Sequence, residues 1–268
     1  MPRAALKAGA ATSNITPPLG VSINGSMRNR VAEHVHDELH ARCIVLDDGQ
    51  TRLGIAVCDS CMIPGAIHDA AKHLAHGHVQ LPMDNILTSA THTHSAPATA
   101  GVFQTDPDEE YGEFLIERIA DGLRRAAHNL APARVAWGSV DVPSEVFNRR
   151  WRMKPGAIPA DPFGRTSDQV RMNPPRASED LLEPAGPTDP EASFLSLQSA
   201  AGAPIALLAN YSLHYVGGTG GNHISADYFG AFAHRLVRLW GVEDQDPPAV
   251  VAMSNGTSGD INNIDFRA

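Results

Sequence analysis

The sequence LHARCIVLDDGQTRLGIAV, residues 39–57, decides the fold class of this chain. Apolar side chains dominate residues 39–46 and 53–57, and runs of this kind are typical of buried strands. Between the two runs, Asp48 and Gly49 form a dipeptide that favours a tight turn with positive φ angles. The stretch therefore predicts a β-hairpin.

Outside this hairpin, helices and strands alternate along the chain. Apolar residues at helical spacing predict helices, and short apolar runs predict strands. The expected helices are residues 63–76, 110–130 and 226–240, and the further expected strands are residues 85–90, 133–142, 192–197, 205–211 and 249–253. Interleaved helices and strands indicate an α/β protein, and hairpins make its sheet mixed rather than purely parallel. We expect one mixed β-sheet flanked by helices.

Residues 148–190 differ in texture from the rest of the chain. They are rich in Pro, Gly, Arg and Asp and show little periodicity, which predicts a long irregular loop. A loop of this length inside a compact domain is usually functional or mobile. We expect one large domain over residues 1–268 that includes this loop.

The composition limits the partners that this chain can bind. Of its 268 residues, 43% are hydrophobic and 19% are charged, as in ordinary globular proteins, and the formal net charge is −9. Nucleic acid binding requires a basic face, so this balance argues against nucleic acid as the main partner. It leaves small-molecule substrates open, and the oligomeric state is undetermined.

Two sequence features bear on the location of the protein. No segment reaches the roughly 18 apolar residues that a membrane span needs. The N-terminal residues show no apolar stretch long enough for a secretory signal. We expect a cytoplasmic protein, or a secreted one if a signal has been removed.

The cysteines do not form a disulfide framework. There are three, Cys43, Cys58 and Cys61, an odd and small number. Cys58 and Cys61 have redox or zinc spacing, but no second pair completes a four-thiolate site. We interpret them as small buried residues at a strand end.

Three segments of unusual sequence follow predicted strands. They are residues 91–105, 212–225 and 254–265. Ligand sites in open α/β sheets lie at the carboxyl ends of strands, so these segments are where we expect a site. They meet there only if their strands run parallel.

The first segment contains His92 and His94. Two histidines at positions i and i+2 of an extended segment lie on one side of it, so both rings can approach one point. Neutral imidazole is a common zinc ligand, and neighbouring hydroxyl groups can orient the rings. A pair of ordinary loop histidines is an equally acceptable interpretation of these two residues.

The second segment begins with His214, where a strand ends and glycines begin. Glycines allow backbone to approach a ligand closely. His223 is a further candidate ligand, although a loop histidine among glycines is more often solvent-facing. Asp227 opens the next predicted helix, where it either caps the helix or belongs to the site.

The third segment, with Asp260 and Asn262, is built of small polar residues. Such residues form tight turns whose free backbone N–H groups can bind an oxyanion. An ordinary Asx-rich turn is the alternative interpretation. Arg149 opens the long loop, and its planar fork suits a carboxylate or an oxyanion, unless it is simply a solvated charge. Asp59 follows a strand and is another candidate carboxylate.

The chain resembles the catalytic domain of the neutral/alkaline non-lysosomal ceramidase family. The resemblance rests on motifs that occur in the family's order: the opening segment 8–18, Thr91-His92-Thr93-His94-Ser95 with Pro97, Phe147-Asn148-Arg149, His214, and Gly259-Asp260. The His-x-His motif with its flanks is fairly specific, and the other motifs gain weight from their order.

The resemblance implies a zinc-dependent hydrolase with one Zn²⁺ per chain, acting on a lipid-like amide in sphingolipid metabolism. His92 and His214 would ligate the zinc. His94 and Arg149 would bind or polarise the scissile carbonyl, and a metal-activated water would attack it. His94 is also the candidate donor of a proton to the amine leaving group.

The sequence departs from the family in three ways, of which one is the distinct character of residues 150–190, which leaves a substrate other than ceramide open. A serine that assists catalysis in the family is replaced by Asn262, which can donate a hydrogen bond but cannot relay a proton. Family enzymes complete the zinc site with a Glu and a Tyr further downstream and carry a C-terminal β-sandwich, whereas this sequence ends at Ala268. We therefore expect a catalytic domain truncated at its C-terminal end, or a site completed by Asp59, Asp227 or another chain.

These departures leave two alternatives to a ceramidase-like amidohydrolase. One is a metal hydrolase of the same superfamily that acts on a small polar amide or an ester. The other is a non-catalytic binding domain with an incomplete metal site.

Overall fold

The computed structural model describes residues 5–268. The chain separates into two compact units. Among these residues, unit 1 comprises 5–138, Phe194–Ala209 and Gly217–Ser254, and unit 2 comprises Ser139–Ser193, Asn210–Val216 and Asn255–Ala268. None of the helices within residues 5–268 is long and apolar enough to cross a membrane.

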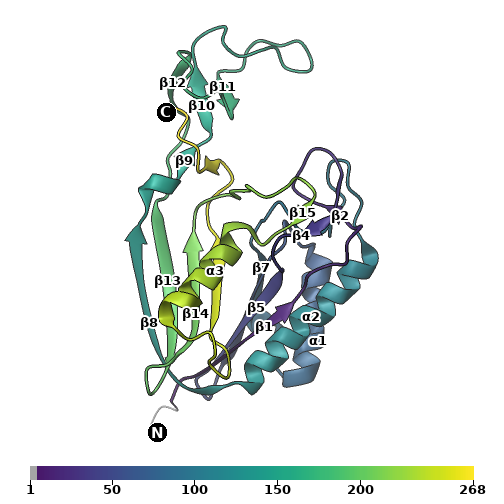
Figure 1. Ribbon diagram of the computed structural model, residues 1–268, viewed down its shortest axis with the longest axis vertical. Coiled ribbons are helices and arrows are strands. Elements are labelled where there is room, and N and C mark those ends of the chain that lie inside the picture. The colour runs from purple at the N-terminus through teal and green to yellow at the C-terminus, as the bar shows by residue number, and fades with distance from the viewer. Residues whose placement is uncertain (1–4) are drawn as a thin grey trace. The chain divides into compact units, whose positions relative to one another are not determined.

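Within the described residues, eight strands form one large sheet in the order β16-β14-β13-β8-β1-β5-β6-β7 (Figure 1). Their bounds are β1 Lys7–Asn14, β5 His40–Asp47, β6 Arg52–Cys58, β7 Ile86–Ala90, β8 Ala131–Asp141, β13 Glu191–Ser199, β14 Pro204–Tyr211 and β16 Val250–Asn255. β5 pairs with β6 in antiparallel fashion, while β6 and β7 run parallel. The expected mixed sheet of an α/β protein is therefore confirmed.

The β5–β6 hairpin forms where residues 39–57 predict it. Gly49 has a φ of 84°, and the Asp48 carboxylate accepts hydrogen bonds from the backbone N–H groups of Gln50 and Thr51. Asp47 accepts two hydrogen bonds from the Arg52 guanidinium across the turn. These local contacts explain why the turn and its register are readable from the sequence.

Three α-helices accompany the sheet within the described residues: α1 Gly65–Val79, α2 Glu109–His128 and α3 Asp227–Trp240. α2 packs against β1 and β5, and α1 packs against α2 (Figure 1). Asp108 caps α2 by accepting a hydrogen bond from the N–H of Tyr111. Leu115, Ile119 and Leu123 are fully buried on the face of α2 that covers the sheet.

Strand β1 is an element that the sequence analysis did not predict. All eight of its residues pair with β5. Its sequence, KAGAATSN, lacks the large β-branched residues that usually mark a strand. The small residues are needed because α2 lies close: a Cβ on Gly9 would lie 2.2 Å from the backbone oxygen of Ala126.

Short strands and 3₁₀ turns complete unit 1. The strands are β2 Ser22–Ile23, β3 Arg30–Val31, β4 His34–Val35 and β15 His223–Ile224, and the 3₁₀ turn is η1 Met83–Asn85. β2 pairs with β3, and β4 pairs with β15.

Unit 2 contains more regular structure than the expected irregular loop at 148–190. Its elements are η2 Pro143–Glu145, β9 Phe147–Asn148, β10 Arg150–Met153, β11 Val170–Met172, β12 Leu181–Pro184 and β17 Ile261–Asn262. β10 lies between β11 and β12, and β9 pairs with β17. Trp151, Met153 and Phe266 form a small buried core. Periodicity failed to reveal these strands because they are only two to four residues long.

Candidate functional site

The His-x-His motif begins where β7 ends. The N–H of Thr91 donates to the Cys58 carbonyl at 2.9 Å, and the N–H of His92 donates to the Ser60 carbonyl at 2.8 Å. The chain then turns sharply, because His92 has a φ of 71° in the left-handed region. A non-glycine residue in this region is uncommon and is often associated with a functional site.

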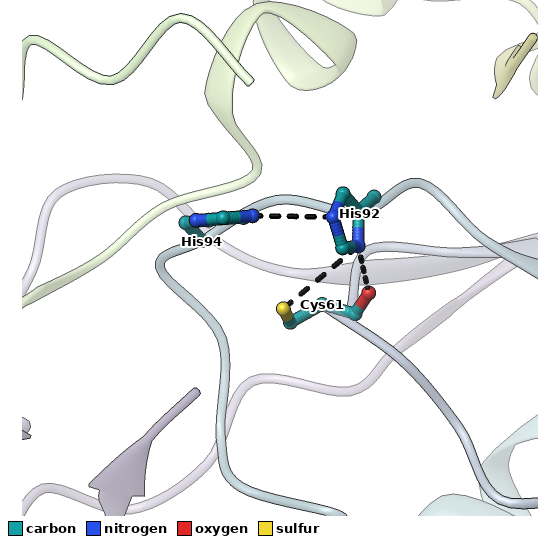
Figure 2. A group of neighbouring side chains, drawn as sticks. All are labelled: Cys61, His92 and His94. Atoms are coloured by element: carbon teal, nitrogen blue, oxygen red, sulfur yellow. Dashed lines mark hydrogen bonds between the residues drawn. The ribbon is translucent and has the colours of Figure 1, made fainter. Parts of the chain in front are cut away.

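The rings of His92 and His94 meet at one point (Figure 2). His92 Nε2 and His94 Nε2 are 3.2 Å apart, and the ring planes are 88° from each other. The sequence analysis predicted this convergence from an extended segment, whereas it results from the left-handed turn at His92. Two nitrogens bound to one tetrahedral zinc ion at about 2.0–2.1 Å would be about 3.3 Å apart, so this pair fits such an ion.

A backbone carbonyl determines which nitrogen of His92 carries the proton. His92 Nδ1 is 2.6 Å from the carbonyl oxygen of Cys61. Because a carbonyl oxygen only accepts hydrogen bonds, Nδ1 is the donor, and the lone pair of the neutral ring is on Nε2. Metal-ligating histidines typically make this second contact.

The side chain of Cys61 belongs to the same group. Its Sγ is 3.9 Å from His92 Nδ1 (Figure 2). One ligand atom from each of Cys61, His92 and His94 lies within 4.8 Å of the others, so these residues could hold a metal ion. Cys61 is buried, as expected for a small residue after a strand, and burial raises the pKa of its thiol to about 12. Without a metal, this thiol is therefore a poor nucleophile at neutral pH.

The segments that follow β7 and β14 meet at buried polar residues of unit 1. Thr93 Oγ1 donates to the Ser225 carbonyl at 2.8 Å, and the N–H of Ser225 donates to the Ser95 carbonyl at 2.9 Å. Ser225 Oγ donates in turn to the Asp37 carboxylate at 2.6 Å. β7 and β14 are not neighbours in the sheet, so hydrogen bonds between the segments, rather than adjacent strands, bring them together.

Gly25 and Arg30 hold His94 from the side of the β2–β3 hairpin. Gly25 has a φ of 98°, and a Cβ at this position would lie 2.5 Å from the Cβ and Cγ of His94. Arg30 donates hydrogen bonds to the carbonyls of His94, Asn24 and Gly221. The position of His94 therefore depends on a glycine and a guanidinium that the sequence analysis did not select.

Unit 2 contains Arg149, Asp260, Asn262 and His214. The N–H of Arg149 donates to the Asp260 carbonyl at 2.8 Å, and its guanidinium donates to the Gly259 carbonyl at 2.6 Å. Burial lowers the pKa of Arg149. Asn262 is the last residue of β17 and pairs with β9, directly before Arg149. The Asn-Arg segment and the Gly-Asp turn are therefore neighbours in this unit.

His214 repeats the arrangement seen at His92. It is buried, and its Nδ1 is 3.0 Å from the carbonyl oxygen of Ser258. The carbonyl again requires Nδ1 to be the donor, which leaves the lone pair on Nε2. Both histidines predicted to ligate zinc thus have the tautomer that presents Nε2 to an ion.

The remaining candidates have other contacts. Both carboxylate oxygens of Asp59 lie 2.6 Å from Nη1 of Arg42, and Asp59 is fully buried. The Asp227 carboxylate accepts hydrogen bonds from the N–H groups of Gly217 and Tyr228, and Asp227 is the first residue of α3. The metal-ligating roles of Asp59 and Asp227 stay predictions.

His223, the third loop histidine, lies in a different group of unit 1. Its ring centroid is 4.7 Å from that of His34 and 6.4 Å from that of His36. Its Nδ1 accepts a hydrogen bond from the N–H of Gly220. These contacts follow from the parallel pairing of β15 with β4.

These features define a class of protein: an α/β protein with an imidazole pair and a thiol at the end of a parallel strand pair. The profile of the family described as neutral/alkaline non-lysosomal ceramidase, N-terminal, matches residues 7–264. The chain belongs to this family.

Two solved structures share the fold. The crystal structure of neutral ceramidase from Pseudomonas aeruginosa superposes with a TM-score of 0.74 at 19% identity, covering 98% of this chain and 40% of that chain. A ceramidase complexed with C2 also gives a TM-score of 0.74, at 20% identity, covering 97% of this chain and 39% of that chain. The chain thus spans about two fifths of the length of the structures it matches.

Proposed function

We propose that this chain carries the metal-binding part of a zinc-dependent hydrolase that cleaves the amide bond of an N-acyl, ceramide-like substrate. The observation that carries the proposal is the 2.6 Å contact of His92 Nδ1 with the Cys61 carbonyl, which leaves Nε2 of His92 to bind an ion, in a chain that belongs to the ceramidase family. A neutral imidazole of this kind suits zinc.

In this proposal, His92 and His214 are the zinc ligands. Each donates its Nδ1–H to a backbone carbonyl, of Cys61 and of Ser258 respectively, and so presents Nε2. A divalent cation bound to an Nε2 of this kind would act as a Lewis acid toward the substrate. The carbonyl contacts fix the ring orientation before the cation binds.

The other proposed residues act on the substrate. Arg149, held by the carbonyl of Gly259, would bind the scissile carbonyl, and Asn262 would donate a hydrogen bond to the oxyanion. His94 would give a proton to the leaving amine. Asp260 would act through Asn148, whose Nδ2 donates to the Asp260 carboxylate at 3.1 Å.

The test measures zinc content and amide hydrolysis in the wild type, His92→Ala and His214→Ala. We expect about one zinc per wild-type chain and loss of zinc and activity in both variants, with far-UV circular dichroism unchanged. His128→Ala is the matched control, because His128 is exposed at the end of α2. Zinc content or hydrolysis that persists in His92→Ala would contradict the proposal.

Asn262 favours a second candidate, a hydrolase that acts on a small polar amide or an ester. An ester has a better leaving group than an amide and needs less help from a proton relay, which the asparagine cannot provide. A screen of N-acyl amides against matched esters separates the two: a ceramide-like amide as the best substrate supports the first candidate, and an ester supports the second.

A further inference from the structure

The segments that follow β6 and β7 bring Cys61 beside His92. These two strands run parallel, so their carboxyl ends lie at the same edge of the sheet. The pairing continues past both strands, since Thr91 donates to the Cys58 carbonyl and His92 to the Ser60 carbonyl. The next residue, Cys61, is therefore held level with the imidazole of His92.

The Cys61 sulfur is buried beside the imidazole of His92. The carbonyl oxygen of Cys61, at 2.6 Å, and its Sγ, at 3.9 Å, both approach Nδ1 of His92, while His94 approaches Nε2 of the same ring (Figure 2). The three candidate ligand atoms lie within 4.8 Å of one another. Around a tetrahedral zinc ion with Zn–S of about 2.3 Å and Zn–N of about 2.0–2.1 Å, sulfur and nitrogen would be about 3.5 Å apart. Rotation of the Cys61 side chain on metal binding would bring the sulfur to this distance from Nε2 of His92.

We propose that Cys61 Sγ is a thiolate ligand of the metal ion held by His92. The inference rests on the proposed metal-dependent function and deepens it. On binding, the S–H bond of Cys61 is replaced by an S–metal bond, and the proton leaves to water, with no change of oxidation state. A thiolate among the ligands favours zinc over magnesium or calcium, which prefer oxygen donors.

Cys58 provides a matched control in the same Cys-x-x-Cys pair. It is also fully buried, but it is the last residue of β6 and lies outside the group formed by Cys61, His92 and His94. Replacing either cysteine with alanine removes one buried sulfur, so a difference between the two variants reports the position of the sulfur and not its loss.

The experiment replaces the metal with Co²⁺ in the full 268-residue chain and records the near-ultraviolet absorption, where thiolate ligation of cobalt produces a charge-transfer band. We expect the band in the wild type and in Cys58→Ala, and its loss in Cys61→Ala and in the near-isosteric Cys61→Ser. We also expect Co²⁺ affinity to fall at least about 10-fold in both Cys61 variants. Binding should release one more proton in the wild type than in these variants.

The outcomes separate the two proposals. Cobalt that binds to the wild type and is lost in His92→Ala, without a thiolate band, would overturn the role of Cys61 and leave the proposed function intact. A band that persists in Cys61→Ala, or disappears in Cys58→Ala, would also overturn it. No cobalt binding in the folded wild type would overturn both. Circular dichroism of each variant establishes whether it is folded. If Cys61→Ala does not fold, the result for Cys61→Ser decides the role of Cys61.

Discussion

Replacing Asp59 with alanine should destabilise the fold far more than it affects the metal chemistry. Asp59 is fully buried, and both of its oxygens lie 2.6 Å from Nη1 of Arg42. One oxygen also accepts a hydrogen bond from the N–H of His40 at 2.9 Å. The side chain of Arg42 is only 6% exposed, so the variant leaves its charge buried without this carboxylate.

The magnitude follows from this burial. Removing one partner of a buried ion pair typically destabilises a protein by about 3–5 kcal/mol, because the remaining charge is desolvated and uncompensated. For a chain of this size that corresponds to a fall in Tm of roughly 10 °C. Arg42→Ala should have a similar effect, and the double variant should lose much less than the sum of the two single variants.

The assay is urea unfolding of the wild type, the two single variants and the double variant, with zinc content measured on the same samples. A loss below about 1 kcal/mol in Asp59→Ala would refute the reasoning from burial. Zinc that disappears in Asp59→Ala but remains in Arg42→Ala would instead place the Asp59 carboxylate on the ion, as the sequence analysis allowed.

Two further predictions concern a glycine and a histidine. Gly25→Ala should destabilise the chain by about 1–3 kcal/mol more than Gly20→Ala in thermal melts, because both glycines have a φ of 98° but only the Gly25 Cβ would meet His94, at 2.5 Å; equal losses would contradict this. Burial and the charge of Arg42 lower the pKa of His40. At pH values just below about 6.5, the unfolded chain therefore binds more protons than the folded chain, so the free energy of unfolding should fall as the pH falls. In His40→Gln, the free energy of unfolding measured in urea should depend less on pH over this range. The same pH dependence in His40→Gln and in the wild type would argue against this role of His40.

The elements that the sequence predicted are those specified by interactions between residues close together in the chain. The β5–β6 hairpin depends on Asp48 and Gly49, whose contacts lie within the turn itself. Helix α2 is amphipathic over its length and begins directly after Asp108, which caps it. Signals of this kind lie within a few residues of the structure they specify, so they survive in any tertiary context.

Strand β1 and the short strands of unit 2 lack sequence signals of this local kind. The sequence of β1 reflects the close approach of α2 to Gly9 rather than strand propensity. The strands in residues 148–190 are held by pairing with one another, as Trp151 pairs with Arg171 on one side and Pro184 on the other. Pairing between distant segments leaves little trace in the periodicity of a short strand.

The sequence by itself determined which chemical groups are present, the two imidazoles of the His-x-His motif above all, and that they follow a buried strand. Only the tertiary structure decided which groups share a place. The parallel pairing of β6 with β7 brings Cys61 to His92, and the carbonyl of Cys61 selects the tautomer of that ring. At the end of the same strand, Asp59 accepts a hydrogen bond from the guanidinium of Arg42. The physical reason is that a short polar side chain interacts only within a few ångströms, and chain packing, not the order of residues, determines which partner lies within that distance.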